Sequence, residues 1–301
     1  MRILGTAAGG GLPQWNCGCP PCERARASRS GAAADGWRTQ ESLALSVSPG
    51  TWYLVNASPE LRAQLLAAPE LAPPPGTRDT PVRGVLLTDG ELDHTVGLFA
   101  LREGAELELH APAAVLAALG EQFPLRALLA PYGAVRWHPL ASERFLLDGG
   151  RLAVTVLPIG DKRPRYARES TAPGPWVVAY RFEEVATGAA LVYAPSLAHW
   201  PPGFDRWLAG AGCVLLDGTC WTDDELVLAT GGTGATATAM GHLPISGPGG
   251  SLARFRDCPA EHRLYTHLNN TNPLTDPASA AAAELRLSGV SVARDGQVIE
   301  L

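Results

Sequence analysis

The chain has 301 residues, 46% of them hydrophobic and 18% charged, a composition typical of a globular protein with enough apolar material for a large core. Its net charge is −6 and it has no long basic run, which argues against nucleic acid or an anionic membrane as the main partner. No window approaches the roughly 20 apolar residues of a membrane-spanning helix. The first residues lack the apolar run of a signal peptide, so we expect a cytoplasmic protein.

In the first half of the chain, the pattern predicts strands that alternate with helices. Ser58 followed by Pro59 at the first helical position is typical of a helix start. Pro49-Gly50 predicts a hairpin turn between two strands. The predicted strands are 1–7, 42–48, 51–58 and 82–87, and the predicted helices are 58–71 and 95–102.

The second half continues the alternation. Asp295-Gly296 predicts the turn of a hairpin that closes the chain over 291–301. The other predicted elements are a helix at 113–123 and strands at 106–111, 134–140, 151–159, 176–184, 189–196, 212–219 and 262–270. Strands, helices and hairpins together predict an α/β fold of mixed, helix-covered sheets, either as one layered domain or as two packed halves.

Three apolar strands end in residue types that bind metal ions. "VLLTDGELDH" ends in Asp93 and His94, "VLLDGT" contains Asp217, and "LYTHLNN" contains His267. Enzymes of the α/β class build their sites on loops at strand ends. Each residue alone fits a structural role, such as a helix cap or a core hydrogen bond, but the three together favour a shared site.

The donor set of this predicted site fits more than one metal. Asp93, His94 and His267 form a 2-His-1-carboxylate set, which leaves positions open on iron(II) for oxygen and substrate. Zinc with a bound water, arranged for hydrolysis, fits the same donors. Asp217 is a candidate further ligand, a bridge between metals, or a catalytic residue.

A further histidine, His242, lies in the Gly-flanked loop "MGHLPISG". It is either an acid/base or substrate contact of the site, or a loop histidine bonded by backbone. The histidines at 110, 138, 199 and 262 have no partners nearby in sequence, which favours structural roles for them.

The segment "CGCPPC" places Cys17, Cys19 and Cys22 within six residues, in a loop at about 15–24. Three thiols so close together can converge on one tetrahedral zinc ion, which then needs a fourth ligand. Candidates for the fourth ligand are Asn270, a distant cysteine and His262. The alternatives are three reduced surface cysteines, or a redox pair of Cys19 and Cys22 that leaves Cys17 unexplained.

Nearly end to end, the sequence resembles the PqqB family of pyrroloquinoline quinone (PQQ) biosynthesis, within the metallo-β-lactamase-fold superfamily. The strings that carry the resemblance are "GTAAGGGLPQWNCGCPPC", "VLLTDGELDHTVGLFALREG", "LLDGT", "MGHLPISG" and "THLNNTNPL". The resemblance implies a single domain over 1–301. Its fold would be an αββα sandwich of two mixed β-sheets flanked by helices, with metals at one edge of the sheets.

Hydrolases of this superfamily carry a His-x-His-x-Asp-His loop, a later His, a bridging Asp and a final His. On this chain the first two histidines fall on Asp89 and Glu91, and "GDKRPRY" at 160–166 lacks the later histidine. The resemblance therefore implies that one metal position is lost, while coordination by Asp89 or Glu91 stays open. The retained ligands are Asp93, His94 and His267, with Asp217 in the bridging place.

For function, the resemblance implies an iron-dependent, oxygen-using hydroxylase. Its substrate would be the tyrosine ring of a Glu–Tyr unit from a precursor peptide. The active-site metal would be Fe(II), with O₂ as co-substrate, or zinc in the protein as isolated. A structural zinc ion would bind at the cysteine cluster. The alternatives are a protein that binds or carries PQQ or its precursor without turnover, a metal-dependent hydrolase, and a paralogue in another peptide-derived natural product pathway. The oligomeric state stays open, with a homodimer as the candidate assembly.

Overall fold

The computed structural model describes residues 1–28, 36–104, 106–133, 135–140 and 143–301. The chain divides into two compact units. Unit 1 comprises Met1–Gly5, Ser42–Gly188 and Gly296–Glu300, and unit 2 comprises Thr6–Glu41, Ala189–Asp295 and Leu301. Within the described residues, no helix is both long and apolar enough to cross a membrane.

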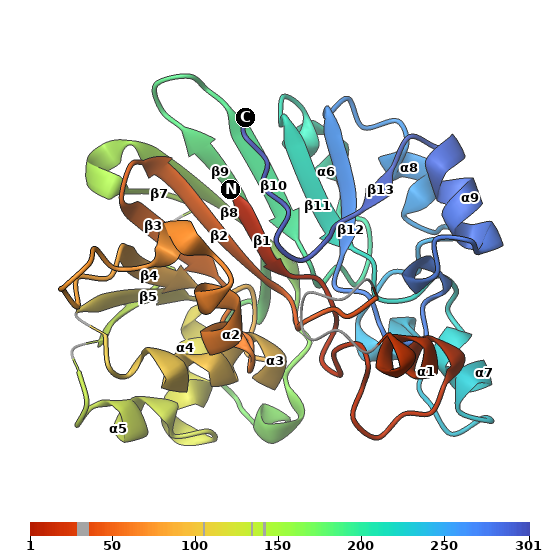
Figure 1. Ribbon diagram of the computed structural model, residues 1–301, viewed down its shortest axis with the longest axis horizontal. Coiled ribbons are helices and arrows are strands. Elements are labelled where there is room, and N and C mark those ends of the chain that lie inside the picture. Colours follow the sequence, from red (N-terminus) through yellow and green to blue (C-terminus); the bar gives the residue numbers. More distant parts are fainter. Residues whose placement is uncertain (29–35, 105, 134, 141–142) are drawn as a thin grey trace. The chain divides into compact units, whose positions relative to one another are not determined.

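Unit 1 contains a mixed sheet of six strands in the order β1 to β6 (Figure 1). The first three strands are antiparallel, and β3 to β6 are parallel to their neighbours. The six strands are β1 (Arg2–Gly5), β2 (Ser42–Ser48), β3 (Thr51–Val55), β4 (Val82–Leu86), β5 (Leu107–Ala111) and β6 (Val135–Pro139). Three further strands of unit 1 are antiparallel to one another: β7 (Arg144–Leu147), β8 (Leu152–Gly160) and β9 (Val177–Glu184).

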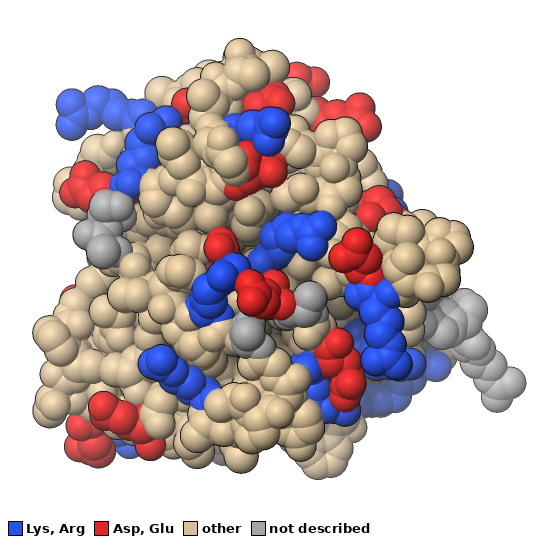
Figure 2. Space-filling view, turned by 90° about the vertical axis from the view of Figure 1, so that its left-hand side faces the viewer, with Lys and Arg blue, Asp and Glu red and all other residues tan. Residues whose placement is uncertain are grey.

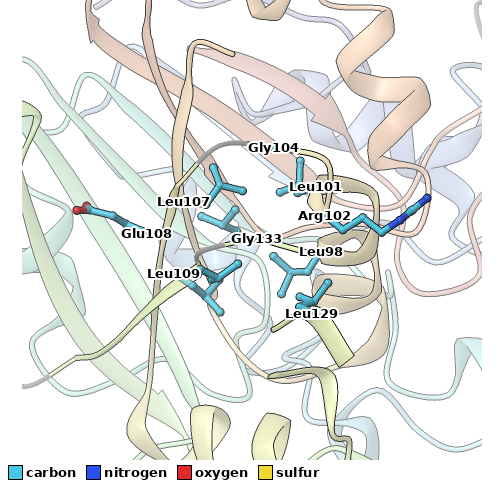
Figure 3. Close-up of a pocket in the computed structure, with 11 residues that line it drawn as sticks. Leu98, Leu101, Arg102, Gly104, Leu107, Glu108, Leu109, Leu129 and Gly133 are labelled. Carbon is cyan, nitrogen blue, oxygen red and sulfur yellow. The ribbon is translucent and has the colours of Figure 1, made fainter. Parts of the chain in front are cut away.

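Helices lie along one side of the six-stranded sheet (Figure 1). They are α2 (Leu61–Leu66), α3 (Leu92–Thr95), α4 (Ala113–Glu121) and α5 (Leu125–Leu129), with 3₁₀ turns η1 (Pro69–Leu71), η2 (Val96–Leu101), η3 (Asp148–Gly150) and η4 (Arg165–Ala167) elsewhere in the unit. Figure 3 shows leucines of η2, β5 and α5, including Leu98, Leu109 and Leu129, around one small apolar pocket. Burial of these leucines holds the helical layer on the sheet.

Unit 2 is built on four parallel strands, β10 (Ala190–Ala194), β11 (Cys213–Asp217), β12 (His262–Thr266) and β13 (Ser291–Val292). Every residue of β10 and β11 is buried, as expected of a parallel sheet covered on both faces. The helices of the unit are α1 (Pro20–Ala27), α6 (Phe204–Leu208), α7 (Glu225–Ala229), α8 (Leu252–Phe255) and α9 (Ala280–Leu287), with 3₁₀ turns η5 (Thr238–Met240) and η6 (Pro273–Thr275).

The structure differs from the sequence predictions in several elements. The predicted helix at 95–102 is one short α-helix, α3, followed by the 3₁₀ turn η2. The helix predicted from 58 begins at Leu61, because the backbone carbonyl of Ser58 already accepts the Leu61 N–H in a turn. Strand β7 and the helices α1, α5, α6, α7, α8 and α9 were not predicted. The expected hairpin over 291–301 is absent among the described residues, since β13 pairs with β12 and Val298 pairs with Arg2.

Charged side chains of both signs are interspersed on the face shown in Figure 2. The net charge of −6 is therefore not gathered on this face into one acidic field. At physiological ionic strength, salt largely screens interactions between exposed charges that are more than about 8 Å apart.

The loop after β4 is fastened to the loop after β3. Asn56 adopts a left-handed conformation with φ 61°, and its Oδ1 accepts the Thr88 N–H at 3.0 Å. The Ala57 N–H donates to the His94 carbonyl at 2.7 Å, and the Gly97 N–H donates to the Ala57 carbonyl at 2.9 Å. These backbone hydrogen bonds fix the position of the His94 backbone, and therefore the point from which its side chain extends.

Gly97→Ala tests this fastening. A Cβ at this position would overlap the Ser58 carbonyl oxygen and stand 2.7 Å from that of Ala57, so backbone must move. We expect a loss of about 1–3 kcal/mol in the free energy of unfolding, measured by denaturant titration. The control is Gly120→Ala in α4, where a Cβ meets nothing within 4 Å. The control should be neutral or slightly stabilising, and equal stability of both variants would contradict the account.

Candidate metal centre

In unit 1, the buried side chain of His94 is oriented by Asp89. The His94 Nδ1 lies 2.7 Å from Asp89 Oδ1, and Asp89 also accepts from the Glu91 N–H at 3.0 Å and the Thr88 hydroxyl at 3.1 Å. A carboxylate only accepts, so we assign the ring proton of His94 to Nδ1. Its Nε2 then carries the lone pair that a metal ion needs.

Asp93 lies on the Nε2 side of the same ring. Its Oδ2 is 3.8 Å from His94 Nε2, close enough for both atoms to bind one ion. The predicted ligands Asp93 and His94 therefore face a common point, while Asp89 lies on the other side of the ring as the group that orients it.

Glu91 is paired with a lysine. Its Oε1 lies 3.3 Å from Lys162 Nζ, and Lys162 belongs to the segment after β8 in which the hydrolase pattern would place a histidine. Burial raises the pKa of Glu91, against the opposing effect of the Lys162 charge. Nearby, the Tyr166 hydroxyl donates to the Gly90 carbonyl at 2.6 Å and ties this segment to the loop.

In unit 2, a buried carboxylate organises the residues at the ends of two strands. Asp217 ends β11 and accepts from the Leu197 N–H at 2.8 Å, the Thr219 N–H at 2.9 Å and the Thr219 hydroxyl at 2.7 Å. His242 Nδ1 lies 2.7 Å from Asp217 Oδ2. Burial alone would raise the pKa of Asp217, but the charge and hydrogen bond of His242, with the help of His267 and Thr219, lower it below its ordinary value. Asp217 is thus an ionised acceptor.

The hydroxyl of Thr219 sets the protonation of His267. Thr219 Oγ1 lies 2.7 Å from Asp217 Oδ1 and 2.8 Å from His267 Nδ1. The hydroxyl has one proton and Asp217 can only accept, so the proton of the second bond must come from His267 Nδ1. By the same reasoning His242 donates its Nδ1–H to Asp217. Both histidines therefore keep the lone pair on Nε2, which suits them as ligands or bases.

The backbone of His267 is held in an unusual conformation. Its φ is 59°, a left-handed value that costs a residue other than glycine about 1–2 kcal/mol. The Leu268 N–H donates to the Thr6 carbonyl at 2.9 Å, and the ring of His267 stacks on that of His242 with 5.3 Å between centroids. Strain of this kind is often retained at functional sites.

The three clustered thiols of unit 2 meet at one amide. The Asn270 Nδ2 lies 3.2, 3.4 and 3.5 Å from the Sγ atoms of Cys17, Cys19 and Cys22. An amide rotated by 180° would bring its Oδ1 to the same point, so the four side chains form a set with the donors of a tetrahedral ion. His262, another candidate fourth ligand, instead has its Nε2 3.9 Å from Glu261.

Two residues of these sites were not singled out from the sequence. Thr219 has one signal, its place two residues after the strand-ending Asp217, where a hydroxyl can return to the carboxylate. Lys162 has none, because only the fold brings it to Glu91. The predicted residues are grouped in three places: Asp89, Asp93 and His94 in unit 1, Asp217, His242 and His267 in unit 2, and the thiols with Asn270 in unit 2.

Comparisons with known sequences identify the family of the chain. Residues 51–268 match the β-lactamase superfamily domain. The chain is 42% identical over 306 residues to coenzyme PQQ synthesis protein B of Pseudomonas aeruginosa, covering 100% of this chain and 99% of that protein. It is 41% identical over 308 residues, with the same coverage, to the protein of that name from Cupriavidus necator.

Solved structures agree with the sequence matches. Zn(2+)-bound PqqB from Methylobacterium extorquens superimposes with a TM-score of 0.89 at 35% identity, covering 100% of this chain and 99% of that chain. A diphosphatase from the PhnP family matches with a TM-score of 0.66 at 20% identity, over 99% and 96% of the two chains, and shows the shared fold. The predicted α/β fold of two mixed sheets with flanking helices is thereby confirmed. The chain belongs to the coenzyme PQQ synthesis protein B family of the metallo-β-lactamase fold.

Proposed function

We propose that this chain acts in PQQ biosynthesis as an iron-dependent oxygenase that hydroxylates the tyrosine ring of a Glu–Tyr-derived precursor. The full-length relationship to coenzyme PQQ synthesis proteins supports the pathway. The proposed iron ligands are Asp93, His94 and His267, a 2-His-1-carboxylate set. Bound iron(II) would supply the binding and reduction of O₂ beside the substrate.

The main support for this proposal comes from the contacts of Asp89 and Glu91. These two carboxylates stand where the hydrolases have the histidines of their first metal position. Asp89 accepts the Nδ1–H of His94, and Glu91 pairs with the ammonium of Lys162. A fixed cation thus stands beside Glu91, where a hydrolase would bind a divalent ion. Hydrolysis by two metals needs ions on both the attacking and the leaving oxygen, so a site with one ion favours different chemistry.

The residues of the chain prepare ligands and a base for this reaction. Asp89, and Thr219 together with Asp217, hold the protons of His94 and His267 on Nδ1. His242, which donates to Asp217, is the proposed acceptor of the ring proton through Nε2. In the overall reaction a ring C–H becomes C–OH, the second oxygen atom leaves as water, and a two-electron reductant supplies two electrons and two protons.

The test of this function starts from protein reconstituted anaerobically with iron, zinc or manganese. Oxygen is then added together with candidate Glu–Tyr peptides and a two-electron chemical reductant, and oxygen uptake and peptide mass are followed. We expect uptake and a mass gain of one oxygen atom only with iron and peptide together. Cleavage of a phosphoester or lactam by the zinc form would support the hydrolase instead, and tight PQQ binding without turnover would support a carrier.

The first variants to test are His94→Ala and His267→Ala. Each should abolish stoichiometric iron binding, because two remaining ligands hold Fe(II) weakly. The measurement is iron retained per chain after anaerobic gel filtration. His199→Ala removes an exposed histidine and serves as the matched control. Full iron content in either of the two variants would refute the ligand assignment.

Thr219→Val tests the proton assignment at His267. Valine keeps the shape of threonine but removes the acceptor for His267 Nδ1–H and one donor to Asp217. Loss of such an outer partner typically weakens metal affinity 10–100-fold, and we expect a change of that size in a chelator competition assay. Thr219→Ser should restore most of the affinity. Equal loss in both variants would show that packing, and not the hydroxyl, matters here.

We further propose that Cys17, Cys19, Cys22 and Asn270 bind a structural zinc ion. Cys19→Ser should then lower the melting temperature more than it lowers the oxygenase activity of the folded protein. The variant should also retain about one zinc ion fewer per chain. Cys258→Ser provides the control, because this buried cysteine lies on another segment. A Cys19→Ser variant that keeps wild-type zinc content would exclude the site.

A further inference from the structure

Another group of ligand-type side chains lies in unit 1, on strands β5 and β6. Glu108 and His110 are two residues apart on β5, so their side chains share one face of the sheet. Figure 3 shows Glu108 pointing away from Leu107 and Leu109, which line the pocket on the opposite face. His138 lies directly across from His110 on β6, so the three side chains stand together on one face.

The rings of this group are stacked, and that of His110 is buried. The centroids of His110 and His138 are 4.7 Å apart with 16° between the rings, and Phe145 stacks on the other face of His110 at 5.2 Å. Only 8% of His110 is exposed. One ring nitrogen of each histidine and a carboxylate oxygen of Glu108 all lie within 4.8 Å of one another.

Both histidines have a buried nitrogen to account for. Within the part of the chain that the structure describes, Nε2 of His110 and Nε2 of His138 have no hydrogen-bond partner. Glu108 Oε2 approaches His110 Nε2 at 3.5 Å, longer than the 2.7–2.9 Å of a charged hydrogen bond. Buried polar nitrogens without a partner are uncommon in folded proteins, and an unseen ion is one of their accepted explanations.

The spacing of these atoms fits a tetrahedral metal ion. Zinc binds imidazole and carboxylate at about 2.0–2.2 Å, which puts neighbouring ligand atoms about 3.4 Å apart. Glu108 Oε2 and His110 Nε2 already have nearly this separation, at 3.5 Å.

We propose that Glu108, His110 and His138 form a binding site for a divalent transition metal ion that links β5 to β6. Imidazole is a preferred ligand of zinc, nickel and copper, and zinc also binds carboxylate oxygen. Strand β6 ends the six-stranded sheet, and an exposed sheet edge is a position that proteins commonly protect. An ion bound to one side chain of β6 and two of β5 would hold this edge strand in register.

The experiment titrates metal-free full-length protein with Zn²⁺ against a chromophoric chelator. The variants are His138→Gln and His110→Phe, and the second keeps an aromatic ring against Phe145 while it removes the nitrogen donor. We expect each variant to bind one equivalent of zinc fewer than the wild type. His199→Gln, which changes an exposed histidine outside the group, should bind the wild-type number.

The metal-free melting temperature of each variant, measured with chelator present, shows whether it folds. A folded variant that binds as many zinc ions as the wild type overturns the proposal. If one variant does not fold, the count in the other decides. His94, His267 and the clustered thiols are intact in both variants. The zinc count would therefore still differ by one equivalent between wild type and variant if the iron proposal failed.

Discussion

The candidate centre in unit 2 depends on one buried carboxylate. Asp217 accepts four hydrogen bonds, and two of them determine where protons reside on histidines: directly for His242, and through Thr219 for His267. In unit 1, Asp89 does the same for His94. Each predicted ligand histidine therefore has a fixed tautomer before any metal arrives, which is the arrangement that raises the affinity and precision of imidazole ligands.

A single segment of unit 2 connects this centre with the cysteine cluster. It begins at His267, continues to Asn270, which contacts the three thiols, and ends at Asn272, whose amide donates to the Gly218 carbonyl at 2.8 Å. The Asn269 N–H donates to the Thr219 carbonyl at 2.9 Å. An ion among the thiols would therefore stabilise the same segment that holds His267 in its strained conformation. The proposed zinc site and the proposed iron ligand His267 thus depend on one segment of backbone.

The strand ends could be predicted from sequence because apolar runs such as 82–87 and 212–219 are long and end abruptly in polar ligand types. Asp93, His94, Asp217 and His267 follow from that pattern. The contacts of Lys162 with Glu91, and of His110 with His138, could not be predicted, because they join strands or loops that only the fold brings together. The 3₁₀ turn after His94 was missed since its residues also suit an α-helix. A single domain, a homodimer and a cytoplasmic location stay predictions.

The central claim is a single iron ion held by Asp93, His94 and His267, in place of the paired metals of the hydrolases. Mössbauer spectroscopy of the His110→Phe variant, which lacks the proposed site on β5 and β6, tests it most directly when the protein is loaded with ⁵⁷Fe after zinc has filled the thiol cluster. The account predicts one quadrupole doublet of mononuclear high-spin iron(II), with one iron per chain, and no coupled pair after exposure to oxygen. Two irons per chain that become antiferromagnetically coupled would contradict it, because Asp89 and Glu91 would then have to serve a second ion.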